Sequence, residues 1–277
     1  MAIESMRQAW NAYTRNFWTM IAALLLCVVI ILILVIPMGV AFGVYMIQMG
    51  IPNNPAAFSY AMMNPALIAG FVIVSILLTI VIMELYAGMI GLAKNSLGRR
   101  PSLNVMLRTM KKKFWNILGL NVILAVIILA VFLVTMIPFF ALMASAQIVA
   151  GAVAFLVGMV VTALVGLFFM LSNQALVCSD LTIIDSIKTS FNIVKKNYLD
   201  FFVLVLIFFV AAFLIGFMPI AGFLINWFLV LPLLIISMTV FYLNRKKAIE
   251  QEMKLKERDR LKRKLVARAR RSQAKKK

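Results

Sequence analysis

Residues 3–17 read IESMRQAWNAYTRNF, and residues 184–198 read IDSIKTSFNIVKKNY. The second stretch repeats the first at an offset of 181 residues, with serine and asparagine kept in place and basic residues exchanged conservatively. In both copies apolar residues recur at steps of three and four, and the basic residues lie away from them, so each copy predicts an amphipathic helix. Recurrence of the pattern indicates a repeated structural unit.

A weaker third copy lies between these two at an offset of 97, with Leu103, Leu107, Met110 and Phe114 in the apolar positions. Each copy directly precedes a pair of long apolar stretches. We therefore expect three repeats of an interfacial amphipathic helix followed by a transmembrane hairpin. The expected division is a membrane domain over 1–243, with repeats at about 1–98, 99–180 and 181–243, and a basic helical arm over 244–277.

The composition predicts an all-α integral membrane protein. Hydrophobic residues make up 64% of the chain and charged residues 13%, whereas a soluble domain carries about 25% charged residues. Continuous apolar runs exceed the about 18 residues that a membrane-spanning helix needs. We expect six transmembrane helices at about 17–48, 66–93, 115–137, 148–171, 199–217 and 223–243, the third ended by Pro138 and the fifth by Pro219.

The distribution of Lys and Arg predicts the orientation. Those outside the two terminal segments fall in the connections at 94–113 and 172–198, whereas the connections near 49–65, 138–147 and 218–222 have no charged residue. By the positive-inside rule, we expect a cell-membrane protein with both termini cytoplasmic. The N-terminus does not resemble a cleaved signal peptide.

Aromatic residues cluster where each amphipathic helix meets its span. Such residues are typical of the membrane–water interface, so we expect the three helices to lie on lipid with their basic residues at anionic headgroups. The alternative is that they are extensions of the following spans, packed on neighbouring helices. The predicted interfacial residues are Trp10, Tyr13, Phe17, Trp18, Phe114, Trp115, Phe191 and Tyr198.

The sequence offers little for catalysis. Histidine is absent, which removes the commonest general base and metal ligand, and no nucleophile elbow, phosphate loop or metal motif is present. Cys27 and Cys178 are expected at different depths, without a disulfide. Asp180 and Asp185 are expected to begin the amphipathic helix of the last repeat, where acids suit the helix dipole. We expect no enzyme activity, no metal and no cofactor.

Two features inside the membrane stand out. Small residues recur at every fourth position in Ala150, Ala154, Gly158, Thr162 and Gly166, and again at Gly39 and Gly43. This spacing lets helices approach closely, and we expect packing seams, with a ligand groove as the alternative.

Glu84 is the one charged residue well inside a predicted span. An intramembrane carboxyl is a functional-site hypothesis by default, here the titrating group of a carrier of a small molecule or lipid. The alternatives are a carboxyl that faces the bundle or one that reaches water at the end of a long span.

The basic tail holds most of the net charge of +19, since residues 244–277 contain 16 Lys or Arg and 4 acids. It could fix the topology, attract anionic lipid or bind nucleic acid, of which ribosomal RNA is abundant in the cytoplasm. The tail has no aromatic residue for base stacking, and we expect no recognition of DNA sequence. The predicted polyanion-binding residues are Arg245, Lys246, Lys247, Lys254, Lys256, Arg258, Arg260, Lys262, Arg263, Lys264, Arg268, Arg270 and Arg271.

The stretches WNAYTRNFW (10–18), GLAKNSLGRRPSLNVMLRTMKKKFWNILG (91–119) and SIKTSFNIVKKNYLDFF (186–202) resemble uncharacterised six-span membrane proteins of archaea and bacteria. These are related to the membrane domain that precedes some glycerophosphoryl diester phosphodiesterases. The resemblance covers about residues 1–243 and implies a multi-pass domain without assigned chemistry. Phosphodiesterase activity is not carried over, because no histidine could serve it. The tail separately resembles the ribosome-binding tails of Oxa-type insertases, whose core this chain does not match.

Together these features favour a non-enzymatic protein whose cytoplasmic tail binds a polyanion, with the ribosome as the leading partner and membrane-protein biogenesis as the setting. The alternative is a small-molecule or lipid carrier that uses Glu84, with its tail on anionic lipid. The sequence does not indicate an oligomeric state.

Overall fold

The computed structural model describes residues 2–48, 64–98, 100–145 and 147–251, and within them every regular element is helical. Six helices in these residues are long and apolar enough to cross a membrane, which confirms the predicted all-α, multi-pass class. They are α2 (Phe17–Gln48), α4 (Pro65–Ser96), α5 (Leu103–Ala144), α6 (Ile148–Leu167) continued by α7 (Ser172–Ser179), α9 (Tyr198–Gly216) and a final helix, Pro219–Gln251, that contains α10 (Pro219–Ile225) and the π-helical turn η2 (Asn226–Val230).

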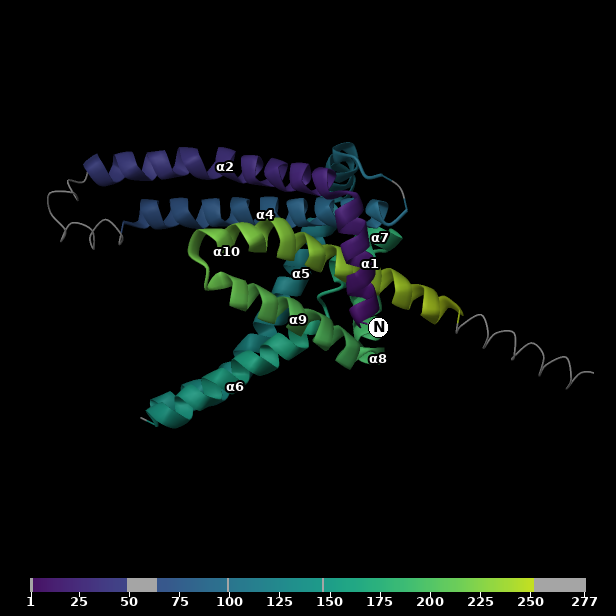
Figure 1. Cartoon of the computed structure of the whole chain (residues 1–277). Helices are drawn as coiled ribbons and strands as arrows, with labels where there is room; N and C mark the ends of the chain where they lie inside the picture. Colours follow the sequence, from purple (N-terminus) through teal and green to yellow (C-terminus); the bar gives the residue numbers. More distant parts are fainter. Residues whose placement is uncertain (1, 49–63, 99, 146, 252–277) are drawn as a thin grey trace, which may run out of the picture.

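Two of the three repeat copies form separate short helices, α1 (Ala2–Arg15) and α8 (Ile183–Lys196). α1 lies across the axis of α2 (Figure 1). The chain breaks at Asn16 and Asn197, the matching asparagines of the repeat. Their side-chain amides donate to the carbonyls of Ala12 at 2.8 Å and Ile193 at 2.9 Å. Each amide thus occupies a carbonyl that would otherwise accept the next helical N–H.

The third copy is not a separate helix, and that expectation was wrong. Residues 103–114 form the first turns of α5, which runs unbroken for 42 residues, or about 63 Å at 1.5 Å per residue. In this copy Lys113 stands where the others carry asparagine. The long Lys113 side chain reaches away from its own turn and pairs with Asp180 instead.

Pro138 does not end the third span, which is a second correction. α5 continues through it to Ala144, as α2 continues through Pro37. Inside lipid, ending a helix would leave several carbonyls and N–H groups unpaired, which costs more than the one hydrogen bond that proline removes. The predicted fourth span, about 148–171, corresponds to α6, and a turn at residues 168–171 then leads into α7.

Burial supports the threefold repeat. Positions related by the offsets of 97 and 181 are buried in all three copies, which places the same face of each unit against the bundle. They are Ala9, Met106 and Ser190, then Met20, Ile117 and Phe201, then Ala23, Leu120 and Leu204.

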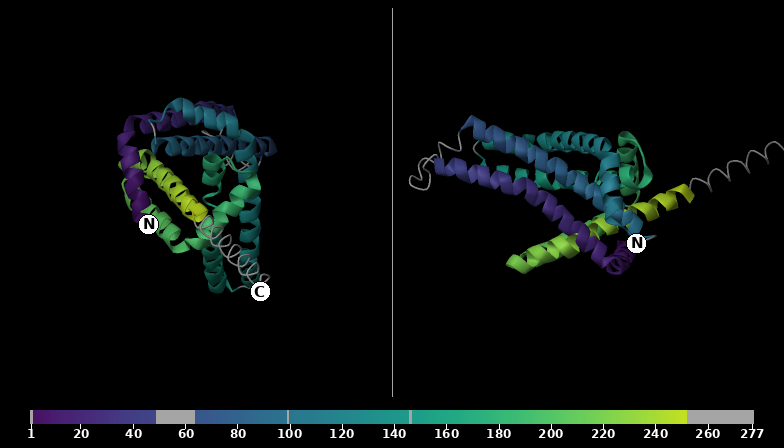
Figure 2. Two further views of the ribbon diagram at one scale, coloured as in Figure 1. Left: turned by 90° about the vertical axis from the view of Figure 1, so that its right-hand side faces the viewer. Right: turned by 90° about the horizontal axis from the view of Figure 1, so that it is seen from above.

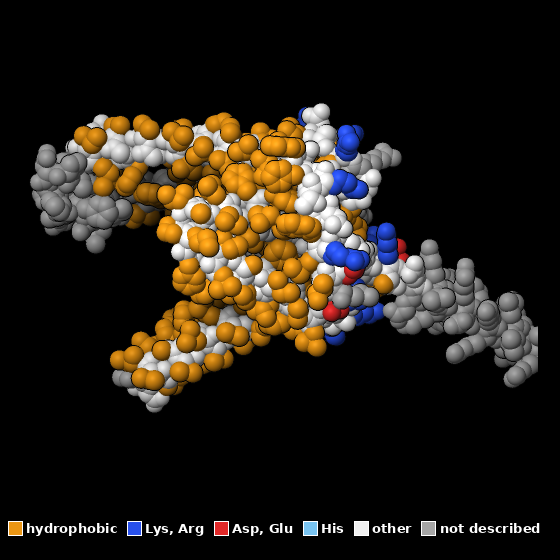
Figure 3. All heavy atoms as spheres, viewed as in Figure 1, with side chains coloured by type: hydrophobic (Ala, Val, Ile, Leu, Met, Phe, Trp, Pro, Cys, Tyr) orange, Lys and Arg blue, Asp and Glu red, His pale blue; other side chains and the backbone are white. Residues whose placement is uncertain are grey.

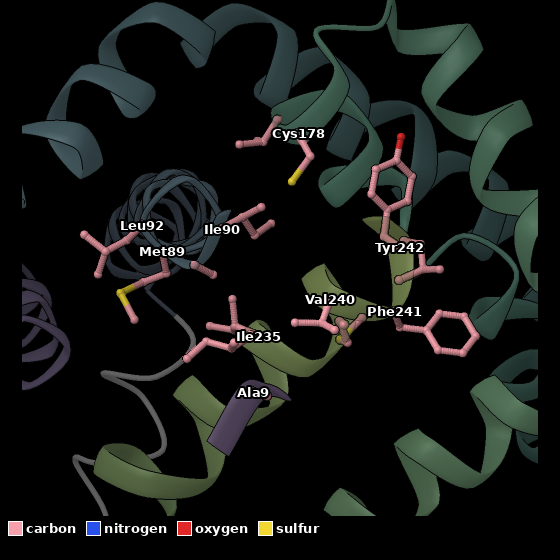
Figure 4. Packing of buried hydrophobic residues seen from close by; sticks show 14 of the residues in the cluster. Ala9, Met89, Ile90, Leu92, Cys178, Ile235, Val240, Phe241 and Tyr242 are labelled. Atoms are coloured by element: carbon pink, nitrogen blue, oxygen red, sulfur yellow. The ribbon is translucent and has the colours of Figure 1, made fainter. Parts of the chain in front are cut away.

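The core lies at one end of the bundle, where the last turns of α4, α7 and the final helix converge (Figure 4). Its members include Ile90 and Leu92 of α4, Cys178 of α7, and Phe241 and Tyr242 of the final helix. Away from this end the hairpins α2–α4 and α5–α6 spread apart (Figure 1), and their apolar side chains are largely exposed. Such faces suit contact with lipid.

The seam along α6 packs against α5, as predicted. Gly158 lies against the backbone of Thr135, where an added Cβ would approach the carbonyl oxygen to 2.8 Å. Thr162 and Thr135 share a hydroxyl–hydroxyl contact of 3.0 Å. The expected seam at Gly39 and Gly43 was wrong for the described residues, because no atom lies within 4 Å of a Cβ built at either glycine.

Candidate functional site at the charged end of the bundle

Charged side chains gather at the end of the bundle that also holds the core (Figure 3). The segments that meet there are α1, the end of α4, the start of α5, α8 and the last turns of the final helix. Between them they carry every Lys and Arg that the structure describes: Arg7, Arg15, Lys94, Arg100, Arg108, Lys111, Lys112, Lys113, Lys188, Lys195, Lys196, Arg245, Lys246 and Lys247. One end of the molecule is therefore cationic, and the rest of the visible surface is apolar.

A groove of about 410 Å³ opens at this end between α4, α5 and α7, and we call it the cationic groove. Four of its lining side chains are basic and one is acidic. Lys94 comes from α4, Asp180 follows α7, and α5 supplies Arg108, Lys112 one turn further on, and the neighbouring Lys113. Three elements distant in sequence thus surround one polar space with a net charge of +3.

Lys113 and Asp180 form the ion pair of this groove, with Nζ and Oδ1 2.5 Å apart. The Lys113 side chain is 11% exposed and that of Asp180 is 63% exposed. Hydrogen bonding from Lys113, aided by the charges of Lys112 and Lys94, lowers the pKa of Asp180. Asp180 has a positive φ of 52° and caps the C-terminus of α7. It does not begin the amphipathic helix as expected, because Thr182 is the N-cap of α8 and accepts from the N–H of Asp185.

The base of the tail docks onto the bundle through two of the predicted polyanion-binding residues. Arg245 forms an ion pair with Asp200 and lies 5.5 Å from the ring centre of Phe241. Lys246 donates to the Ser179 hydroxyl at 2.8 Å, whereas Lys247 is exposed. The other predicted members lie outside the described residues: Lys254, Lys256, Arg258, Arg260, Lys262, Arg263, Lys264, Arg268, Arg270 and Arg271.

A second polar groove, of about 570 Å³, separates α1 from the final helix. Arg15 and Lys247 line it, but Arg15 is engaged with the carbonyl of Ser96 at 2.5 Å. Asn244 donates to Gln8 across the groove at 3.3 Å. Figure 2 shows α1 and the final helix side by side, so these contacts tie the amphipathic helix to the base of the tail.

Glu84 is buried in α4, 5% exposed, and neither carboxylate oxygen has a hydrogen-bond partner among the described residues. Two polar groups that the sequence places in the spans bond elsewhere, whereas Ser237 is also buried without a described partner. Thr79 donates to the carbonyl of Ser75 in its own helix, and Asn121 pairs with Asn173 across the α5–α7 contact at 3.2 Å. A buried carboxyl of this kind can bind a proton or cation, so Glu84 remains a candidate for the titrating group of a carrier.

The predicted interfacial aromatics divide into two groups. Trp10, Phe17, Trp18, Trp115 and Phe191 are exposed, whereas Phe114 and Tyr198 are half-buried, Tyr198 by stacking on Phe168.

Tyr13 is the exception, because it is buried and donates to the carbonyl of Phe228 at 2.6 Å. Burial raises the pKa of its hydroxyl. Tyr13 therefore contacts protein and not solvent or lipid, and the small residues Ala9 and Ala12 beside it let α1 approach the bundle closely.

Metal ligation finds no support in the part of the chain that the structure describes, because no three His, Cys, Asp or Glu side chains cluster there. Cys27 and Cys178 are both buried and free, as expected.

Sequence reasoning missed the ion pairs of Lys113 and Arg245. Lys113 could have been found, since a basic residue replaces asparagine at a buried position of the repeat. The partners, Asp180 and Asp200, are far away in sequence and carry no local signal.

Comparison with known proteins places most of the chain in one family. Residues 39–249 match the family described as Domain of unknown function (DUF7847), and the chain belongs to it. Neither the search of curated proteins nor the search of solved structures found a match.

Proposed function

We propose that this member of the DUF7847 family is a non-enzymatic membrane protein whose basic cytoplasmic tail binds a polyanion, the ribosome, and so assists membrane-protein biogenesis. One observation carries the proposal: the final helix continues from the apolar bundle through Lys247 to Gln251 without a break. Arg245–Asp200 and Lys246–Ser179 contacts fasten its base. A rigid base presents the tail charges at a fixed place on the bundle.

The direction of the final helix supports a ribosome over a lipid surface. Its last described turns project away from the bundle beyond the other charged segments (Figure 1). An arm that binds lipid would lie flat and bury an apolar stripe, whereas residues 244–277 carry no clean stripe and no aromatic residue. Dense cationic charge without apolar anchors is typical of binding to phosphate backbones.

Ribosome co-sedimentation tests the proposal with the full chain in nanodiscs of neutral lipid across a salt series. Replacement of the ten tail cations between Lys254 and Arg271 by Gln should abolish co-sedimentation and its salt dependence. A matched control changes exposed bundle cations, Lys188→Gln with Lys195→Gln, and should keep binding. Equal co-sedimentation of the tail variant and the native chain would refute the proposal.

A second function, transport of a small molecule or lipid, is favoured by the buried and unpartnered Glu84. A proton- or cation-coupled carrier would use this carboxyl as its titrating group. In proteoliposomes, Glu84→Gln should abolish flux of the substrate that is driven by a proton or cation gradient. Glu250→Gln, at an exposed position, should leave this flux unchanged. Unchanged flux in the Glu84 variant would remove this function. The relation to the membrane domain of glycerophosphoryl diester phosphodiesterases remains a hypothesis, carried by the short motifs at 10–18, 91–119 and 186–202.

A further inference from the structure

We infer that the cationic groove is a binding site for a phosphate group, presented by an anionic phospholipid. This site lies on the membrane domain and is separate from the tail, so it goes beyond the proposed function. The inference starts from the charge balance. Lys94, Arg108, Lys112 and Lys113 line the groove together with a single acid, Asp180.

The single acid is already committed. Asp180 bonds Lys113 at 2.5 Å, and Lys94 donates to the carbonyl of Cys178 at 2.8 Å. Arg108 and Lys112 are exposed and form no ion pair with any described acid. Two free cations therefore face a space whose net charge is already positive, and an anion in it would relieve their mutual repulsion.

The chemistry of the lining favours phosphate over a simple carboxylate. Arg108 offers a planar fork of donors that matches two phosphate oxygens, and Lys112, one turn further along α5, supplies a compact point charge. Asn95 and Thr109 add polar groups to the same wall, although the Thr109 hydroxyl donates to the carbonyl of Val105 at 2.7 Å. A tetrahedral anion with several oxygens can accept from Arg108, Lys112 and the Asn95 amide at once.

The depth of the groove favours a lipid as the source of that phosphate. Trp115 follows Lys112 by three residues, so it lies about one turn away on the same helix, and it is 77% exposed. Exposed tryptophan is typical of the headgroup level. Beyond it α5 enters its apolar stretch, with Val122 and Val126 exposed. A cation site directly outside an aromatic belt is at the level of lipid phosphates.

The test measures lipid retained by the full-length protein in detergent, by native mass spectrometry. The probes are phosphatidylglycerol, phosphatidylcholine as the neutral lipid, and inorganic phosphate as a soluble competitor. The native chain should retain phosphatidylglycerol in preference to phosphatidylcholine. Arg108→Gln with Lys112→Gln should weaken retention about tenfold for each cation removed, since a charge-assisted hydrogen bond of about 1.4 kcal/mol corresponds to a factor of ten.

The matched control is Lys111→Gln with Lys188→Gln, which removes the same charge from exposed positions outside the groove. This control should retain phosphatidylglycerol at the native level. Competition by millimolar inorganic phosphate would support the phosphate site and reassign its source to a soluble anion. Equal retention by the groove variant and the control, or equal retention of both lipids by the native chain, would overturn the inference. Gel filtration and thermal unfolding check that both variants fold.

Discussion

α1 and the start of α5 occupy equivalent places in the first and second repeats, yet they have different structures. α1 ends at Arg15 and lies across its span, whereas residues 103–114 run straight into theirs. α8 follows α1. The three copies share their buried face, and the residue at the junction with the span is Asn16 in the first, Lys113 in the second and Asn197 in the third. The two copies with asparagine end there as separate helices, whereas the copy with lysine continues into its span.

The difference has a consequence for the whole charged end. A break after residue 113 would turn the preceding helix aside, and Arg108 and Lys112 would leave the groove. Because α5 is continuous, it stands beside the last turns of α4, and Gly91 lets Thr109 approach so closely that an added Cβ would lie 2.5 Å from its hydroxyl. The second repeat thereby builds a cationic wall where the other two build amphipathic helices.

The largest expected effect on stability comes from breaking the Lys113–Asp180 ion pair, which is found in the copy that lacks the junction asparagine. Asp180→Asn leaves the nearly buried Lys113 charge without its partner. We expect a loss of about 2 kcal/mol in the free energy of unfolding, reduced from the value for a fully buried pair because Asp180 is exposed. Denaturant unfolding in detergent measures it. The double variant Lys113→Met with Asp180→Asn should recover most of the loss, and a harmless single variant would contradict the assignment.

The same pair predicts an acid sensitivity. The pKa of Asp180 is lowered in the folded state by Lys113. Stability from this pair is therefore complete above the unfolded pKa, about 3.9, and is lost as the pH falls through the lower folded pKa. The native chain should lose more stability between about pH 4 and pH 2 than the double variant that lacks both charges. Parallel pH profiles of the two proteins would argue against the pair.

Replacement of the asparagines that end α1 and α8 should have the next largest effect on the free energy of unfolding. Asn16 is buried and its amide donates to Ala12 at 2.8 Å and to Ser96 at 3.4 Å. Asn16→Ala should cost about 1.5 kcal/mol. Asn197→Ala should cost less, because its amide has one acceptor, Ile193, and is less buried. Asn11→Ala, at an exposed position, is the control, and a larger effect there than at Asn16 would reject this account of the junction.

Tyr13 distinguishes α1 from α8, whose equivalent residue is Val194. Its hydroxyl donates to the carbonyl of Phe228, whose usual helical donor four residues on is Pro232, a residue without an N–H. Tyr13→Phe should lower the free energy of unfolding by about 1 kcal/mol. Tyr198→Phe should be neutral, since no hydrogen bond of its hydroxyl is described. Thermal unfolding of both variants decides the point.

The smallest effect on stability is expected at the exposed equivalent positions 10, 107 and 191. These positions nevertheless give the sharpest test of the comparison between the three copies. We expect changes within about 0.5 kcal/mol in stability at each. In a background with Trp18, Trp115 and Trp227 changed to Phe, Trp10 should be quenched by lipid brominated on its acyl chains, and so should a tryptophan at position 191 once Trp10 is also changed. A tryptophan at position 107, with Trp10 also changed, should be quenched less, because residues 103–114 extend α5 through the headgroup level and beyond the acyl chains. Equal quenching at all three positions would mean that all copies lie on lipid.

Much of the fold follows from the sequence because lipid imposes strong rules. Continuous apolar runs must be helices that satisfy their own backbone, so the sequence predicted all six spans. The predicted bounds of α2 and α9 are correct to within a few residues. The prediction that Pro138 ends the third span was wrong, because the tendency of proline to end helices in water does not hold where the helix end cannot be solvated. The candidate site was only partly predictable, since its acid, Asp180, lies at the far end of the second repeat from Lys113 and only the fold brings the two together.

The sequence by itself determined the helical class, the number of spans, the repeat and the gathering of Lys and Arg at one end, because each depends on local hydropathy or on spacing. Only the tertiary structure decided which face of each helix meets protein. Lipid is as apolar as a protein core, so hydropathy does not separate the two. Long-range packing therefore buried Tyr13, left Trp10 exposed, left Gly39 and Gly43 without a described packing neighbour, and brought Lys94, Arg108 and Asp180 around one groove.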